Sequence, residues 1–371
     1  MSSSFHRPSL HQVALSCLLV VCTLVLFFVY YKPEIKFPTS LCAKEVQAQV
    51  SNHSPDQHIN SLHNDTQRVQ AAAVDAELNT VLLIWMWPFG SKFDLNCNIF
   101  NIRCHLTDDK SLYHKAHGVI FHHRDITVAS LPKEPRPWFQ KWVWFNMESP
   151  AHSGQIPEIN HLFNLTCSYR LDSNIPVPYG QLLPLSSGIE SFELPPKDKL
   201  VCWIVSNWNP NLRRVQFYNE LKKHVQINTY GRAFQQRVSD QDYTEIISSC
   251  KFYFSFENSI YKDYITEKLF RPMKLGSVPI VLGPPRQNYE EHIPADSFIH
   301  VDDFSTPKEL AERILYLNQN ITEYMKYFNW KNRFEVQLGG FGQEHACRTC
   351  SYLQKNRRYQ AFHDLNKWYW G

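Results

Sequence analysis

Residues 251–284 read KFYFSFENSIYKDYITEKLFRPMKLGSVPIVLGP and carry the most informative pattern of secondary structure in the chain. It contains two short apolar runs, KFYFSF (251–256) and SVPIVLG (277–283), separated by a helical pattern, ITEKLFRPMKLG (265–276). Short apolar runs are typical of strands that are buried on both faces, and a helix between two of them is the crossover of a parallel sheet. The stretch therefore predicts a strand, a helix and a second strand parallel to the first.

The same alternation continues on both sides of this stretch. LVCWIVS (200–206), VQINTYG (225–231) and SFIHV (297–301) are further candidate strands, and RRVQFYNELKKH (213–224) and DYTEIISSC (242–250) are candidate helices. An earlier set of apolar runs comprises TVLLIW (80–85), GVIF (118–121) and KWVWFN (141–146), and a Pro- and Ser-rich stretch at 184–196 joins the two sets. A chain of 371 residues fits two domains. We therefore predict an α/β protein with two Rossmann-like domains facing a cleft, followed by a long helical stretch (307–330) and a cysteine-bearing tail.

Residues 13–31 carry no charge and are just long enough, at about 1.5 Å per residue, to cross a bilayer core of about 30 Å. A cleaved signal peptide is the alternative, but its apolar region is only about 7–15 residues long. This run is longer and ends at Tyr30, Tyr31 and Lys32, which form a poor cleavage site. We predict a cytoplasmic tail (1–12), a single transmembrane helix (13–31) and a stem (32–78) rich in Ser, Asn, His, Gln and Ala.

The part of the chain beyond the anchor has features of a lumenal protein. Acceptor patterns for N-glycosylation begin at Asn52, Asn64, Asn164 and Asn320. Of the ten cysteines, Cys17 and Cys22 lie in the predicted anchor, and the even number that remains suits disulfides in an oxidising compartment. Half of a zinc site is the other interpretation of Cys347-x-x-Cys350, but no second pair has matching spacing. A net charge of only +3 gives no sign of a nucleic-acid-binding face.

The opening stretch also holds candidate binding residues. A strand ends at Glu257 and Asn258, and the helix that follows carries Glu267 and Lys268 in its first turns. The start of a helix has unpaired N–H groups and a partial positive charge, which suit a phosphate, and Lys268 adds a full charge. Glu267 could accept hydrogen bonds from ribose hydroxyls. The alternative interpretation is an ordinary amphipathic helix with a Glu–Lys pair on its surface.

Several motifs together resemble one known family. FSFENS (254–259), KDYITEKL (262–269) and GSVPIVLGP (276–284) are similar to the signature of the α1,3/4-fucosyltransferases, glycosyltransferase family 10. Further similar stretches are WPFG (87–90), FHHRDI (121–126), FQKWVWFNMESP (139–150), FNLTCSYRLDSNIPVPYG (163–180) and VCWIVSNWNP (201–210). The resemblance runs from about residue 81 to the end of the chain. It implies the GT-B arrangement, with an acceptor-binding domain at 79–195, a GDP-fucose-binding domain at 196–345 and a C-terminal tail at 346–371 that packs back on the acceptor domain.

The resemblance implies an inverting transfer of fucose from GDP-β-L-fucose to the 3-hydroxyl of GlcNAc. Glu148, in FNMESP, would be the general base. Phe89 and Arg124 would face the acceptor. In the family, an Arg at the position of Arg124 goes with type 2 chains, Galβ1,4GlcNAc. The acceptors would be glycoproteins and glycolipids that carry these chains. The product would be a Lewis x-type structure. The protein would be a single-pass type II protein of the Golgi membrane with a lumenal catalytic domain.

The family motifs also imply a set of donor-binding residues. Arg214 and Lys268 would bind the diphosphate, and the rest of the set would hold the nucleotide, its ribose and the fucose: Ser206, Asn207, Tyr253, Glu257, Asn258, Tyr264 and Glu267. The one Asp-x-Asp match, Asp240-Gln-Asp242, precedes a predicted helix, and Ser239 or Asp240 is a natural helix cap there. We therefore expect GDP-fucose as donor substrate, with no cofactor and no obligatory metal.

The disulfides that the resemblance implies are Cys202–Cys250 and two bridges from Cys97 and Cys104 to Cys347 and Cys350. Cys42 and Cys167 are then left over, and Cys42 could pair between chains to give a homodimer. The chain departs from the family pattern at Ser91, after WPFG, and at Pro272, which should remove a helical hydrogen bond and bend the helix. Two other functions stay open: a membrane-anchored glycan-binding protein that has lost catalysis, and a transferase that uses another nucleotide sugar.

Overall fold

The computed structural model describes residues 80–185 and 192–371, all of which belong to one compact unit. The predicted cytoplasmic tail, transmembrane helix and stem, and with them Asn52, Asn64 and Cys42, lie outside the described residues. Within the described ranges, no helix has the length and apolar character needed to cross a membrane.

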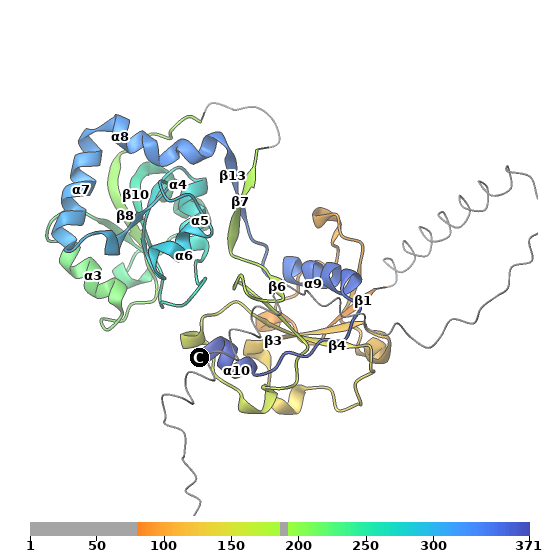
Figure 1. Ribbon diagram of the computed structural model, residues 1–371. Coiled ribbons are helices and arrows are strands. Elements are labelled where there is room, and N and C mark those ends of the chain that lie inside the picture. Colours follow the sequence, from red (N-terminus) through yellow and green to blue (C-terminus); the bar gives the residue numbers. More distant parts are fainter. Residues whose placement is uncertain (1–79, 186–191) are drawn as a thin grey trace, which may run out of the picture. The chain divides into compact units, whose positions relative to one another are not determined.

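The first sheet contains six parallel strands in the order β2-β1-β3-β4-β5-β6. Figure 1 shows β3 and β4 side by side near its centre. Every residue of these two strands is buried, as expected for runs as apolar as KWVWFN. The strands are β1 (Val81–Ile84), β2 (His105–Thr107), β3 (Gly118–His122), β4 (Lys141–Asn146), β5 (Leu165–Ser168) and β6 (Ile175–Pro176).

The second sheet contains five parallel strands in the order β12-β11-β10-β8-β9. They are β8 (Lys199–Ile204), β9 (Asn228–Tyr230), β10 (Cys250–Phe256), β11 (Val278–Leu282) and β12 (Ile299–His300). The two parallel sheets confirm the predicted α/β class, and β10 and β11 are the pair that the opening stretch predicts.

Helices cover both faces of the second sheet (Figure 1). Phe252, Phe254 and Phe256 of β10 pack in one core with α3 (Arg213–Leu221) and α7 (Pro307–Gln319). Tyr253, between them in sequence, points to the opposite face, where it packs with Ile247 of α4 (Asp240–Ser249). The same face also carries α5 (Glu267–Lys274) and α6 (Arg286–Glu290). The largely apolar strand β10 is thus buried on both sides.

A two-stranded antiparallel ladder pairs β7 (Gly180–Pro184) with β13 (Phe334–Leu338). Phe270 of α5 packs so closely on β7 that a Cβ atom at Gly180 would lie 2.4 Å from the Phe270 ring. The segment that follows the first sheet therefore contacts the helix that carries Lys268.

The predicted helical stretch at 307–330 is not one continuous helix. It divides at Asn320 into α7 and α8 (Ile321–Met325), and a 3-10 helix follows at Lys326–Asn332. The Asn320 backbone leaves the helical region, and its side chain caps α8 by accepting a hydrogen bond from the amide of Glu323 at 3.1 Å.

The two predicted glycosylation sites within the described residues differ in their surroundings. Asn320 is half-buried at the junction of α7 and α8. The Asn164 side chain is buried, and its Nδ2 donates to the carbonyl of Gln360 at 2.7 Å. A glycan on Asn164 would require the loss of that contact. Glycosylation at both positions stays a prediction.

Three disulfides join distant parts of the chain: Cys97–Cys347, Cys104–Cys350 and Cys202–Cys250. These are the bridges that the family resemblance implies. Cys347 and Cys350 lie on α9 (Gln343–Lys355), which packs on the first sheet, and Leu353 of this helix covers Gly118 of β3. The C-terminal helix α10 (Leu365–Trp370) follows α9. Cys167 is a buried free thiol, and burial raises its pKa to about 12, which makes it unreactive.

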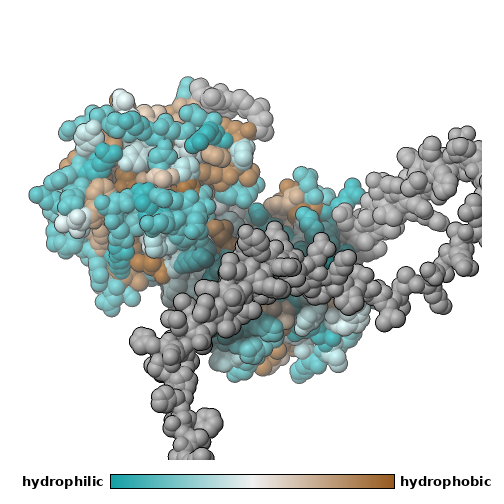
Figure 2. Space-filling model, in the orientation of Figure 1, coloured by the Kyte–Doolittle hydropathy of each residue, from teal (hydrophilic) through white to brown (hydrophobic). Residues whose placement is uncertain are grey.

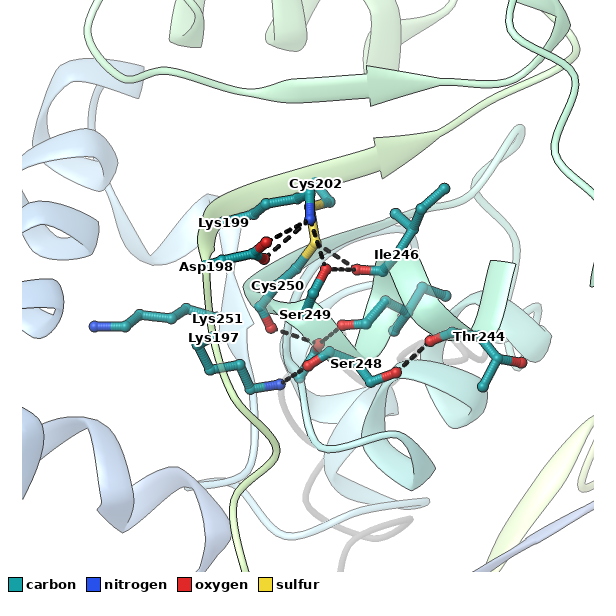
Figure 3. The surroundings of a disulfide bond; sticks show 12 residues. Lys197, Asp198, Lys199, Cys202, Thr244, Ile246, Ser248, Ser249, Cys250 and Lys251 are labelled. Carbon is teal, nitrogen blue, oxygen red and sulfur yellow. Dashed lines mark hydrogen bonds and ion pairs between the residues drawn. A yellow bond between two sulfur atoms is a disulfide. The ribbon is translucent and has the colours of Figure 1, made fainter. Parts of the chain in front are cut away.

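The third disulfide lies within the second sheet (Figure 3). Cys202 of β8 and Cys250 at the start of β10 come from neighbouring parallel strands. Lys199 next to the bridge contacts Asp198 and the Ser249 hydroxyl, and Lys197 donates to the carbonyl of Ser248 at 2.6 Å. The bridge therefore fixes the end of α4 against the edge where β8 begins.

The sequence separation of the two α9 disulfides predicts a non-additive effect on stability. Cys97 and Cys347 are 250 residues apart, but once either bridge has formed, the other closes only a short loop. In the chain-entropy model, replacing one pair by Ala should lower the free energy of unfolding by about 3 kcal/mol, and replacing both pairs should lower it by about 8 kcal/mol. Denaturant unfolding of the two double variants and the quadruple variant measures this. Equal and additive losses would contradict the loop-closure argument.

Candidate active site

A cavity of about 510 Å³ opens at the carboxyl ends of β8, β9 and β10. This is the edge at which open parallel sheets bind ligands, because the loops after the strands meet there. Ser206 and Asn207 follow β8, Asn258 follows β10, and Glu267 and Lys268 begin α5. Arg214 and Tyr253 also line the cavity, which therefore brings together seven of the nine predicted donor residues.

Arg214 is a buried cation in the wall of this cavity. It is the second residue of α3 and is 4% exposed. Its Nη2 donates to the Asn207 carbonyl, and its Nε has no hydrogen-bond partner among the described residues. Burial lowers the pKa of Arg214, but a guanidinium stays protonated at neutral pH. An anion in the cavity would supply the missing partner.

Lys268 is the second predicted diphosphate ligand, and it lies between two carboxylates. Its Nζ is 3.1 Å from Oε1 of Glu267, 3.4 Å from Oε2 of Glu257 and 2.9 Å from Oγ1 of Thr266. Burial alone would lower the pKa of Lys268, but the two carboxylates together raise it. The ammonium group is therefore charged at neutral pH and points toward the same cavity as Arg214.

Glu257 and Tyr264 complete the predicted donor set, but neither lines this cavity. Glu257 is 3% exposed and accepts hydrogen bonds from Thr266, at 2.8 Å from its amide and 2.9 Å from its hydroxyl. Burial raises the pKa of Glu257. Its carboxylate lies behind the first turn of α5 and holds that turn in place. Tyr264 lines a second cavity instead.

Pro272 lies inside α5, as predicted, and the helix continues through it. Proline has no N–H to donate to the carbonyl of Lys268, one helical turn earlier. The Ser255 hydroxyl of β10 donates to that carbonyl instead, at 2.6 Å, and Ser255 is only 1% exposed. The hydrogen bond that Pro272 removes is thus replaced by one that ties Lys268 to the second sheet.

The second cavity has a volume of about 730 Å³ and shares three residues with the first: Asn258, Glu267 and Lys268. The two cavities therefore meet at the start of α5. Glu148, predicted as the general base, lines the second cavity together with Phe89 and Ser91.

The backbone of Glu148 is held from several directions. Its amide donates to Oδ1 of Asn146 at 3.2 Å, and its carbonyl accepts hydrogen bonds from Asn146 and from the hydroxyl of Tyr369. The side-chain Nδ2 of Asn146 also donates to the Ser153 hydroxyl at 2.9 Å. The strand end and α10 thus fix the main chain at Glu148, a residue that lines the second cavity.

Phe89 and Arg124, the predicted acceptor residues, lie next to each other. Phe89 has a left-handed backbone (φ 52°) and is 53% exposed, and its amide donates to Oδ2 of Asp125 at 2.9 Å. The Arg124 guanidinium is 6.0 Å from the centre of the Phe89 ring and donates to the carbonyl of His152. Phe89 lines the second cavity, whereas Arg124 lies beside it on the surface.

The structure adds residues that the sequence analysis did not assign. Arg232, Arg237 and Tyr243 line the first cavity, and His122, Tyr179 and Phe341 line the second. Arg232 and His122 could have been predicted from their positions at strand ends, since Arg232 follows β9 and His122 ends β3. Phe341 had no such signal, because it comes from the loop between β13 and α9.

The Asp-x-Asp match is part of a helix cap. The Ser239 hydroxyl accepts a hydrogen bond from the Asp242 amide, and Oδ2 of Asp242 accepts one from the Ser239 amide, both at 3.1 Å. This reciprocal pair is a capping box at the start of α4. It confirms the interpretation of the motif as a cap.

Comparisons with known proteins agree with this architecture. Residues 77–180 match the family model "Fucosyltransferase, N-terminal", and residues 194–368 match "Glycosyltransferase family 10 (fucosyltransferase) C-term". A Bos taurus protein, 4-galactosyl-N-acetylglucosaminide 3-alpha-L-fucosyltransferase 9, is 47% identical over 99% of this chain and 99% of its own length. The Homo sapiens protein of that name is 53% identical over 78% of this chain and 82% of its own length.

Among solved structures, an α1,3-fucosyltransferase crystallised with GDP-fucose superposes with a TM-score of 0.50 and 16% identity, over 77% of this chain and 92% of the other. At that identity the likeness concerns the fold alone. The shared features are two parallel α/β sheets with cavities at their strand ends. The family models and the relatives go further: this chain belongs to glycosyltransferase family 10, the fucosyltransferases.

The replacement hydrogen bond from Ser255 leads to a testable prediction. Ser255→Ala leaves the buried carbonyl of Lys268 without a donor, so the free energy of unfolding should fall by about 1–3 kcal/mol. In a Pro272→Ala background, the new amide N–H can donate to the same carbonyl, and the cost of Ser255→Ala should become much smaller. Denaturant unfolding of the four proteins in this double-mutant cycle measures the difference. The same cost in both backgrounds would show that Ser255 does not replace the lost helical bond.

Proposed function

We propose that this chain transfers L-fucose from GDP-β-L-fucose to the 3-hydroxyl of GlcNAc in Galβ1,4GlcNAc, in α1,3 linkage and with inversion. The observation that carries the proposal is the junction of the two cavities at Asn258, Glu267 and Lys268. Lys268 lies at that junction, the buried cation Arg214 lies on one side of it, and the carboxylate-bearing residue Glu148 lies on the other. The names of the full-length relatives support the donor sugar, the linkage and the acceptor.

The first cavity would hold the GDP part of the donor. The bond to the anomeric carbon breaks as GDP leaves, and the departing diphosphate gains negative charge. Arg214 and Lys268 would balance this charge, with Arg232 and Arg237 at the edge of the same cavity. In this proposal the four cationic side chains, and not an obligatory metal ion, supply the stabilisation.

The second cavity would hold the acceptor glycan. The 3-oxygen of GlcNAc attacks the anomeric carbon of fucose from the face opposite to GDP, and its proton passes to the carboxylate of Glu148. One C–O bond forms and one breaks, GDP leaves with the electron pair, and the configuration of fucose inverts from β to α. The rigid support of the Glu148 backbone suits a group that must meet one hydroxyl.

The arrangement of two Rossmann-like domains around a cleft, GT-B, is part of this proposal, as is a type II location in the Golgi membrane. The uncharged run at 13–31, the glycosylation patterns and the three disulfides support a lumenal catalytic part. Glycoproteins and glycolipids that end in Galβ1,4GlcNAc would be the acceptors.

The donor placement is tested by Arg214→Ala and Lys268→Met. Each variant removes a charged partner of the diphosphate, which should reduce kcat/KM for GDP-fucose roughly 10- to 100-fold. Lys274→Met, at the exposed end of the same helix, is the matched control and should leave donor kinetics unchanged. Steady-state kinetics with varied GDP-fucose makes the measurement. Normal donor kinetics in both variants would refute the placement of GDP in the first cavity. Activity with only another nucleotide sugar would refute GDP-fucose as the donor.

The role of the base is tested by Glu148→Gln, which keeps the size of the side chain but cannot accept a proton at neutral pH. General-base catalysis contributes about 100- to 10,000-fold, so kcat should fall by that order while GDP-fucose binding stays the same. Glu158→Gln, an exposed glutamate in the same part of the chain, is the control. If Glu148 only orients the acceptor, the Gln variant will instead raise the acceptor KM and keep near-normal turnover. A wild-type protein that binds the glycan without transfer would favour the glycan-binding alternative.

A further inference from the structure

His122 is the last residue of β3 and lines the second cavity together with Glu148. Its side chain is 1% exposed, so both ring nitrogens need hydrogen-bond partners from within the protein or from a ligand. Nδ1 has such a partner, because it lies 2.6 Å from Oδ2 of Asp125. Nε2 has none among the described residues.

The Asp125 contact determines which nitrogen carries the proton. Burial lowers the pKa of His122, although Asp125 opposes the effect, so the ring is neutral at neutral pH. A carboxylate accepts hydrogen bonds and does not donate them, so the ring proton is on Nδ1. Nε2 is therefore left as an acceptor with a free lone pair.

Aromatic rings surround the rest of His122. The ring centres of Phe89, Phe145 and Phe341 lie 4.8, 5.1 and 6.1 Å from that of His122. None of these side chains has a hydrogen-bond donor of the strength that a buried nitrogen requires. Nε2 is itself buried among these rings, and the second cavity, which His122 lines, is the space from which a ligand donor would reach it.

The same cavity wall offers an aromatic surface. The rings of Phe89 and Phe341 are stacked, with centres 6.1 Å apart, and they are 53% and 48% exposed. Asp125 holds both His122 and this aromatic surface in place, because its Oδ2 contacts Nδ1 of His122 and also accepts a hydrogen bond from the Phe89 amide. An apolar wall with a few placed polar atoms is typical of sites that bind small ligands.

We propose that His122, oriented by Asp125, determines acceptor specificity by accepting a hydrogen bond at Nε2 from one hydroxyl of the acceptor saccharide. The stacked rings of Phe89 and Phe341 form the apolar surface beneath that sugar. His122 takes no proton from the reacting hydroxyl, which is the role of Glu148. This inference rests on the proposed function, since it names a recognition contact in the same site.

Two substitutions of His122 test the roles of its two ring nitrogens separately. His122→Asn keeps a donor near the position of Nδ1, so it can still bind Asp125, but it has no atom at the position of Nε2. His122→Gln has an amide oxygen that can reach the Nε2 position and accept a hydrogen bond. His123→Asn is the matched control, because both nitrogens of buried His123 already have partners, Trp144 at 3.1 Å and Gly154 at 2.8 Å.

The experiment uses the full-length protein in detergent, Galβ1,4GlcNAc, and a set of analogues in which each hydroxyl in turn is replaced by hydrogen. Binding to the GDP-loaded protein is measured by calorimetry, and kcat and KM are measured for transfer. The wild type should lose about 10-fold in affinity for one deoxy analogue, other than the analogue that lacks the reacting hydroxyl. The His122→Asn variant should bind the parent disaccharide about 10-fold more weakly than the wild type does, and removal of that one hydroxyl from the disaccharide should weaken its binding no further. Its kcat at saturating acceptor and its KM for GDP-fucose should be unchanged.

His122→Gln should recover part of the loss, and His123→Asn should lower the melting temperature while leaving the pattern across the analogues as in the wild type. The inference is overturned if the His122→Asn variant binds the disaccharide as tightly as the wild type does. It is also overturned if the variant binds every analogue more weakly than the wild type by the same factor, which would indicate a purely structural role. A wild type that binds the analogues with the expected pattern but transfers no fucose would contradict the proposed function and leave His122 supported. A wild type that binds no disaccharide would refute both.

Discussion

The hydrogen bonds between Glu257 and Thr266 are the interaction on which both cavities depend. Glu257 follows β10 and is buried, and a buried carboxylate requires charged and polar partners in its surroundings. It finds them in the amide and hydroxyl of Thr266, the N-cap of α5, and in Lys268 two residues later. These contacts fix where α5 begins relative to the second sheet. Since Glu267 and Lys268 line both cavities, the geometry at which the two cavities meet follows from this one buried carboxylate.

The loop between Glu257 and α5 extends this constraint to the first sheet. The Ser259 hydroxyl donates to the Ser149 hydroxyl at 2.7 Å, so the neighbour of Asn258 contacts the neighbour of Glu148. Asp263, with a left-handed backbone (φ 59°), accepts from the Leu171 amide at 3.0 Å and from Asn288 at 2.6 Å. Although burial alone would raise the pKa of Asp263, its hydrogen bonds lower that pKa to about 2, so the carboxylate stays charged. A single loop thus couples residues that line the first cavity to the segment that carries Glu148.

The sequence predicted the parts of the fold that depend on local pattern. β4 has the bounds of the apolar run KWVWFN, and β10, α5 and β11 follow the order that their sequence indicates. What it did not predict depends on contacts between distant residues. Pro272 was recognised as a break in the hydrogen bonding of α5, but only the fold shows that Ser255 replaces the lost bond. Likewise, the aromatic surface joins Phe89 to Phe341, and the two are separated by most of the chain. Asn320 divides a helical stretch because its side chain caps the next helix, which composition alone does not reveal.

The end of the chain belongs to the site as much as the strand ends do. Tyr369 of α10 donates to the carbonyl of Glu148, and the indole of Trp370 donates to the carbonyl of Ser153 at 2.9 Å. Tyr369 also packs edge-on against Trp144 of β4, with ring centres 4.7 Å apart. Helix α9, just before this segment, is tied to the first sheet by two disulfides. In the proposed reaction Glu148 must present its carboxylate to one hydroxyl, and a backbone that is held on both sides suits that role. Here β4 holds one side and the C-terminal helix α10 holds the other, and the two disulfides of α9 fasten the segment that leads to α10.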